Sequence, residues 1–133
     1  MSRKRENVRQ CKAIRQLIDD NKYTKALELI DAIPLEEVGS LDDLYRYAEL
    51  YEKAERMDKK KEIFYHIYHR THSRYMLNRL LRLTIRMGDM EEARELYFAY
   101  EVAGPITLDT FELRYLLAKA EGCLLYTSPS PRD

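Results

Sequence analysis

The stretch 86–100 specifies a helix end, a short turn and the start of a second helix. Gly88 is the only residue in it that adopts left-handed backbone at no steric cost, which predicts that the preceding helix ends there. Asp89 is suited to cap the next helix, and Glu92 three residues later completes a capping box. Apolar or small side chains then recur at helical spacing: Ala93, Leu96, Tyr97 and Tyr100. We therefore expect an antiparallel helical hairpin in which small Ala93 allows close helix approach.

Composition narrows the class of protein. The 133 residues suffice for one domain. The 23 basic side chains are matched by 23 acidic ones, so no net charge attracts nucleic acid or a membrane surface. No apolar run approaches the roughly 18 residues of a membrane helix, so we expect no membrane segment. Only Cys11 and Cys123 are present, which leaves no disulfide framework and indicates the reducing cytoplasm.

Helical periodicity continues along the chain. We expect one domain, 1–122, with these elements: hairpins at about 5–33, 41–70 and 74–103, and an unpaired helix at 107–122. Ser40 and Asp43 form a second capping box, and Asp58 can cap the helix after it. The unpaired helix turns these side chains inward: Phe111, Leu113, Leu116, Leu117 and Ala120. Because its partner arm is missing, its leucine face (Leu113, Leu116 and Leu117) should be partly bare.

The hairpins repeat. Ala26 and Ala93 occupy the same place in their second arms and lie 67 residues apart, close to two periods of about 34 residues. The middle copy departs from the pattern, because Lys60 stands near the position of the small residue. A first-arm pattern is carried by Leu44, Tyr47, Ala48 and Tyr51, and in weaker form by Leu77, Leu80, Leu81 and Thr84.

From Arg5 to about Gly122 the chain thus resembles tetratricopeptide (TPR) repeats, with Pro105 at the loop after a second arm. The resemblance implies an all-α fold of antiparallel helix hairpins stacked as a short right-handed superhelix of about seven helices. It also implies a concave groove, lined by first arms, that binds a peptide. Pentatricopeptide repeats share the hairpin, but the neutral charge argues against an RNA-threading array.

The last eleven residues, Cys123–Asp133, break from this pattern. They resemble, residue for residue, the translation of a transposase-type sequencing-library adaptor. We interpret them as an adaptor-derived artefact tail, exclude them from fold reasoning and expect the natural protein to continue past Gly122.

Three arginines form the strongest candidate binding feature. Arg79, Arg82 and Arg86 lie along one side of a predicted helix, where like charges need compensation. In one interpretation Glu49, Glu52 and Glu55 of the preceding first arm supply it. In the other, the arginines face the groove and bind acidic side chains or a carboxylate of a partner protein or peptide. The remaining groove residues would then be Tyr75 and Asn78, with Asp42, Tyr45 and Glu49 from the preceding first arm.

The histidine, tyrosine and lysine clusters of the sequence are interpreted as structural or solvent-exposed. His66, His69 and His72 could share a zinc ion, but three solvated histidines are the simpler account. Tyr65, Tyr68 and Tyr75 interleave with Arg70 and Arg74, and we favour tyrosine packing between helices over base stacking. Lys59, Lys60 and Lys61 are interpreted as a solvated first helical turn.

The sequence contains no nucleophile and base pair, phosphate loop or cysteine pair, so we expect neither an enzyme nor a bound cofactor. The leading hypothesis is a non-catalytic protein-interaction scaffold. The alternatives are RNA binding by the basic and aromatic region 59–86, and a regulatory repeat region of a larger protein truncated after Gly122.

Overall fold

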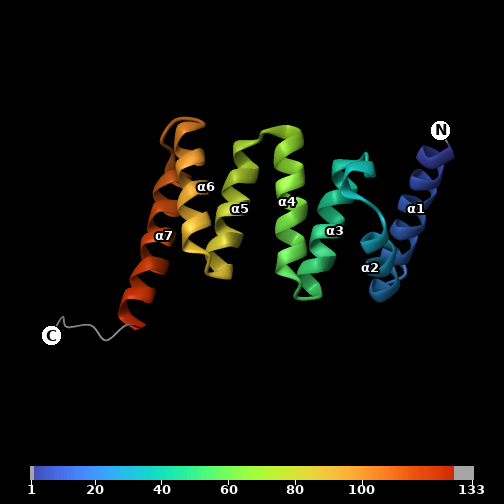
Figure 1. Cartoon of the computed structure of the whole chain (residues 1–133), viewed down its shortest axis with the longest axis horizontal. Helices are drawn as coiled ribbons and strands as arrows, with labels where there is room; N and C mark the ends of the chain where they lie inside the picture. Colours follow the sequence, from blue (N-terminus) through green and yellow to red (C-terminus); the bar gives the residue numbers. More distant parts are fainter. Residues whose placement is uncertain (1, 128–133) are drawn as a thin grey trace. The chain divides into compact units, whose positions relative to one another are not determined.

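The computed structural model describes the backbone of residues 2–127 and the side chains of residues 8–122, and over these residues it contains helices and no strand. The predicted all-α class is therefore confirmed (Figure 1). The elements are α1 (Ser2–Asp19), α2 (Tyr23–Ala32), the 3-10 turn η1 (Leu35–Glu37), α3 (Leu41–Lys53), α4 (Met57–Thr71), α5 (Arg74–Met87), α6 (Met90–Val102) and α7 (Leu108–Thr127). None of the described helices combines the length and apolar character that crossing a bilayer requires.

The chain forms two compact units. The N-terminal unit is Met1–Arg70 and the C-terminal unit begins at Thr71. Within each unit, consecutive helices run antiparallel, as hairpins do (Figure 1). The right-handed stacking of all the hairpins involves both units together and stays a prediction.

A partly buried ion pair joins α1 to the start of α3. Ser40 Oγ accepts a hydrogen bond from the Asp43 amide at 3.4 Å, as expected of an N-cap. The Asp43 carboxylate, however, does not reach back to Ser40. It is 2% exposed and accepts two bonds from the Arg15 guanidinium, from Nε at 2.8 Å and from Nη2 at 2.9 Å. Asp43 therefore ties two helices together.

The start of α4 differs from the sequence prediction. The helix begins at Met57, so Asp58 lies inside its first turn and does not cap it. Lys60 is only 7% exposed, and its ammonium pairs with Glu52 of α3 and lies 5.3 Å from the ring centroid of Phe64. The prediction of a solvated lysine turn is therefore wrong for Lys60. Its charge is buried at low cost because a carboxylate compensates it.

The turn between α5 and α6 has the chemistry that the sequence predicts. Gly88 ends α5 in left-handed backbone, with φ at 85°. The Asp89 carboxylate then accepts a hydrogen bond from the Glu92 amide at 3.2 Å. Ala93 is fully buried, which is consistent with close helix approach at that position.

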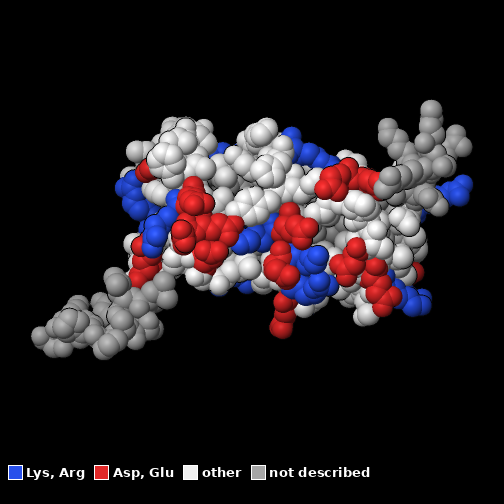
Figure 2. Space-filling view, in the orientation of Figure 1, with Lys and Arg blue, Asp and Glu red and all other residues white. Residues whose placement is uncertain are grey.

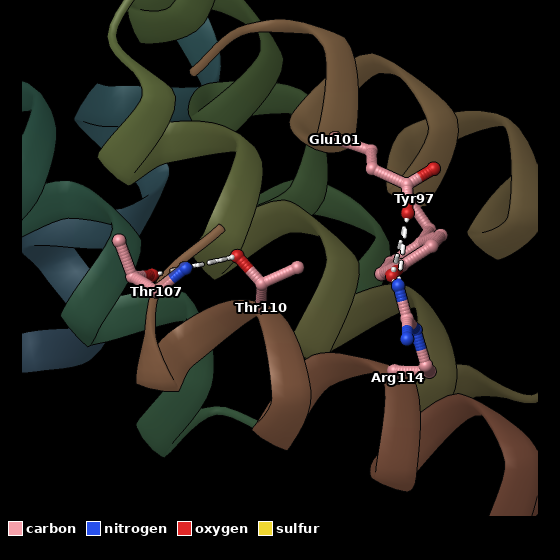
Figure 3. A network of polar contacts seen from close by, with 5 residues as sticks. All are labelled: Tyr97, Glu101, Thr107, Thr110 and Arg114. Carbon is pink, nitrogen blue, oxygen red and sulfur yellow. Dashed lines mark hydrogen bonds and ion pairs between the residues drawn. The ribbon is translucent and has the colours of Figure 1, made fainter. Parts of the chain in front are cut away.

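Polar side chains fix α7 to α6 (Figure 3). Arg114 donates from Nε to the Tyr97 hydroxyl at 2.9 Å and from Nη2 to Glu101 at 3.1 Å, and Tyr97 donates to Glu101 at 3.1 Å. The bonds to Tyr97 and Glu101 raise the pKa of the Arg114 guanidinium. At the start of α7, the Thr107 amide donates to Thr110 Oγ1 at 3.0 Å (Figure 3).

The apolar surface of α7 is distributed differently from our prediction. Leu113 and Leu117 are buried, because this face packs against α5 and α6, so the prediction of a bare leucine face is wrong for both. Phe111 was expected to point inward and is instead 55% exposed. Exposed apolar side chains lie on the other face of α7 and beside it: Val102, Ile106, Leu108, Phe111 and Tyr115. Figure 2 shows an uncharged area over the α6–α7 connection.

Candidate functional site

A row of exposed and half-buried side chains runs along α5 in the C-terminal unit. One face of α5 is buried through Met76, Leu77, Leu80, Leu81, Leu83 and Thr84. The opposite face carries the α5 row, which we define as Tyr75, Arg79, Arg82 and Arg86. Their spacing of four, three and four residues keeps these side chains within a narrow stripe. The predicted alignment of the three arginines on one side of the helix is therefore present.

Tyr75 lies at the N-terminal end of the α5 row. Its side chain is 59% exposed, so the interpretation of Tyr75 as a packing residue is wrong. The Arg79 guanidinium carbon lies 5.9 Å from the centre of the Tyr75 ring. Arg79 and Arg86 are both exposed. The row thus places an exposed aromatic ring next to the permanently charged guanidinium group of Arg79.

Arg82 is the most constrained member of the row. Its Nε donates to Asn78 Oδ1 at 2.7 Å, and its Nη1 pairs with Glu112 of α7 at 3.0 Å. Asn78 therefore positions Arg82 and is itself buried. The sequence interpretation named Glu49, Glu52 and Glu55 as compensating carboxylates and missed Glu112. No local pattern identifies Glu112, because it lies 30 residues from Arg82 in the sequence.

The other predicted groove residues lie on α3 in the N-terminal unit. The spacing of Asp42, Tyr45 and Glu49 places them along one side of the helix. Asp42 and Glu49 are exposed, and Tyr45 is partly buried. A groove shared by these residues and the α5 row stays a prediction, because the two sets belong to different units.

Two arginines of the basic and aromatic region 59–86 donate hydrogen bonds to backbone carbonyl groups. Arg70 donates to the carbonyl oxygens of the α2–α3 connection, those of Leu35, Val38 and Gly39, at 3.2, 2.5 and 3.3 Å. Arg74 donates from Nε to the Tyr100 carbonyl at 3.0 Å, and its guanidinium carbon lies 4.0 Å from the Tyr100 ring centroid. Gly104 leaves room for it, since a Cβ there would lie 2.8 Å from Arg74 Nη1.

His66 and His69 contact other side chains of α4. His66 Nε2 lies 3.0 Å from Arg70 Nη2, and burial, with a smaller contribution from Arg70, lowers the pKa of His66. The His69 ring lies 6.2 Å from that of Tyr65 and 5.7 Å from that of Tyr68. Within residues 8–122, no three histidine, cysteine or acidic side chains are arranged to hold a metal ion.

A pocket in the N-terminal unit was not predicted. It has a volume of about 320 Å³ and is formed by the end of α2, by η1, by Tyr51 of α3 and by the first turns of α4. On its wall the Tyr51 hydroxyl donates to the Asp31 carboxylate, which also accepts from Arg56 Nη1 at 3.3 Å. The bond from Tyr51 and, less strongly, Arg56 lower the pKa of Asp31. Three separate segments form the pocket, so no single stretch of sequence indicates it.

Comparison with protein-family models, with curated proteins and with solved structures finds no match to the chain.

Proposed function

We propose that this chain is a non-catalytic protein-interaction scaffold of TPR-like hairpins that binds an acidic segment of a partner protein along α5. The observation that carries the proposal is the α5 row, in which one stripe combines exposed Tyr75, Arg79 and Arg86 with half-buried Arg82. Arginine forks bind carboxylates with two parallel hydrogen bonds, and tyrosine offers a large contact area at low entropic cost. The row therefore suits glutamate or aspartate side chains spaced along an extended or helical peptide.

The fixed geometry of Arg82 supports the proposal. Asn78 and Glu112 hold its guanidinium in place, so little side-chain entropy is lost when a ligand carboxylate binds beside it. The pair with Glu112 supports a carboxylate as the ligand, because one carboxylate of the chain already binds to the row. An acidic peptide would bring carboxylates beside the exposed side chains of Arg79 and Arg86.

RNA binding by region 59–86 has weaker support. Lys60 is buried against Glu52, and Arg70 and Arg74 hold backbone carbonyls. Phosphate groups could bind these side chains only after the internal contacts break. Breaking them costs free energy, so RNA binding would be weakened.

Selection from a random peptide pool displayed on beads tests the proposal. We expect the selected peptides to be enriched in aspartate and glutamate, and the variant R79E/R86E to lose them while keeping its helicity. Arg82 is left intact, because replacing it would also break the Glu112 pair. The variant R9E/R46E, which makes the same charge change at exposed sites of the N-terminal unit, should bind normally. Peptides without acidic bias, or equal binding by R79E/R86E, would reject the proposal.

A further inference from the structure

The pocket of the N-terminal unit has an apolar floor. Ile30, Ile33 and Ile63 line it and are 3%, 6% and 1% exposed. Leu35 adds a further apolar contact from η1. A volume of about 320 Å³ lies at the lower end of the range for sites that enclose a small ligand. It suits one long side chain of a partner rather than a large cofactor.

Acidic groups dominate the rim of the pocket. Its charged lining residues are Asp31, Glu36, Lys59 and Glu62. Lys59 Nζ lies 3.6 Å from Glu62, and Arg56 binds Asp31, so these two carboxylates are compensated. Glu36 makes no hydrogen bond or ion pair to another side chain in the part of the molecule whose side chains are described. Of the lining carboxylates, Glu36 is therefore the one outside an ion pair; it interacts electrostatically with His66, and Arg70 binds the nearby carbonyls of Leu35 and Val38.

The end of α2 adds to this negative potential. The last carbonyl groups of a helix lack partners within the helix and carry partial negative charge. The last turn of α2 contains no basic side chain to offset that charge, and residues 30–33 line the pocket. The first turns of α4, which carry the opposite partial charge, also line the pocket, but Glu62 lies among them. A cation is therefore favoured beside Glu36.

The pocket wall is held in place before any ligand arrives. Arg70 binds the carbonyls of Leu35, Val38 and Gly39, which fixes the connection that carries Glu36. Tyr51, which also lines the pocket, donates a hydrogen bond to Asp31. A preformed site loses less entropy on binding than a flexible one.

We infer that this pocket binds the side chain of a lysine or arginine residue from a partner protein, with the aliphatic stem against the isoleucines and the cationic head beside Glu36. The site uses the opposite charge from the α5 row and none of its residues. Its test is therefore independent of the proposed function.

The experiment is a titration of the full chain, labelled at isoleucine methyl groups, with Nα-acetyl-lysine methylamide and Nα-acetyl-arginine methylamide, followed by NMR. We expect saturable shifts at Ile30, Ile33 and Ile63. The norleucine analogue keeps the stem and lacks the charge, so it should bind about tenfold more weakly. Absence of shifts at the three isoleucines, or equal binding of norleucine, would overturn the inference.

Three variants test the charge assignment. Glu36→Gln should weaken binding several-fold, and Lys59→Gln should strengthen it because a competing cation is removed. Glu28→Gln, at an exposed position of α2 outside the pocket lining, should change nothing. Equal affinities of wild type and Glu36→Gln would refute the role of Glu36 even if the peptide analogues bind.

Discussion

Asp43 shows how one side chain can hold two helices together. Its carboxylate is almost fully buried, and both of its oxygens are bound by Arg15 of α1. We predict that Asp43→Ala lowers the free energy of unfolding by about 1–3 kcal/mol, because a charge-assisted bidentate contact is lost. Asp42→Ala changes the same first turn of α3 at an exposed site, so its effect should stay below about 0.5 kcal/mol. Urea unfolding measures both, and equal effects would contradict this role for Asp43.

The contact between Tyr51 and Asp31 predicts a dependence of stability on pH. The pKa of Asp31 lies below its ordinary value of 3.8 because Tyr51 donates a hydrogen bond to the carboxylate. The unfolded chain therefore binds this proton more tightly, so the contribution to stability is present above pH 3.8 and is lost as the pH falls through the lowered pKa. Tyr51→Phe should remove it.

Urea unfolding of wild type and Tyr51→Phe across acidic pH checks this prediction. The difference in unfolding free energy between them should shrink as the pH falls below 3.8. Tyr115→Phe, at a side chain that is 62% exposed, should give a small difference that does not vary with pH. A constant difference for Tyr51→Phe would show that the hydroxyl does not act through Asp31.

At the scale of the elements, the end of α5 depends on one backbone conformation. Gly88 has φ at 85°, and a Cβ added there would meet no atom within 4 Å, so the cost of Gly88→Ala is conformational alone. We predict a loss of about 1–2 kcal/mol in unfolding free energy. Gly39→Ala is the matched control, because that site is equally open and its φ is not positive, and its effect should be within about 0.5 kcal/mol. Thermal melts of the two variants that coincide would contradict this explanation.

The helix ends and caps were predictable because their chemistry is local. Gly88 acts through its own backbone, and Asp89 binds an amide three residues away. The contacts that join helices were not predictable in this way. Asp43 and Arg15 lie 28 residues apart, and Glu112 and Arg82 lie 30 apart, so their pairing follows from packing that sequence periodicity does not resolve.

The same limit applies to the candidate sites. Periodicity placed the three arginines on one side of α5. The exposure of Tyr75 and the hydrogen bond from Arg82 to Asn78 depend on packing and side-chain geometry, which periodicity does not specify. The face of α7 was misjudged for a related reason. Apolar residues occur on both sides of that helix, and only its packing against α5 and α6 decides that Leu113 is buried while Phe111 is exposed.

At the scale of the whole molecule, the balanced net charge conceals local imbalance. Acidic and basic side chains are interspersed on the visible surface (Figure 2). The α5 row nevertheless concentrates positive charge in the C-terminal unit, and the pocket rim carries negative charge in the N-terminal unit. Each unit therefore has a local charge that the net charge of the chain does not reveal.

The central claim is that the α5 row binds carboxylates of a protein rather than phosphates of RNA. Fluorescence anisotropy can compare a labelled glutamate-rich peptide with a labelled single-stranded RNA of equal length, over a range of salt concentrations. We predict that the peptide binds, that R79E/R86E weakens it about tenfold or more, and that the RNA does not bind even at low salt. RNA binding with a steep salt dependence, together with no binding of the peptide, would contradict the account.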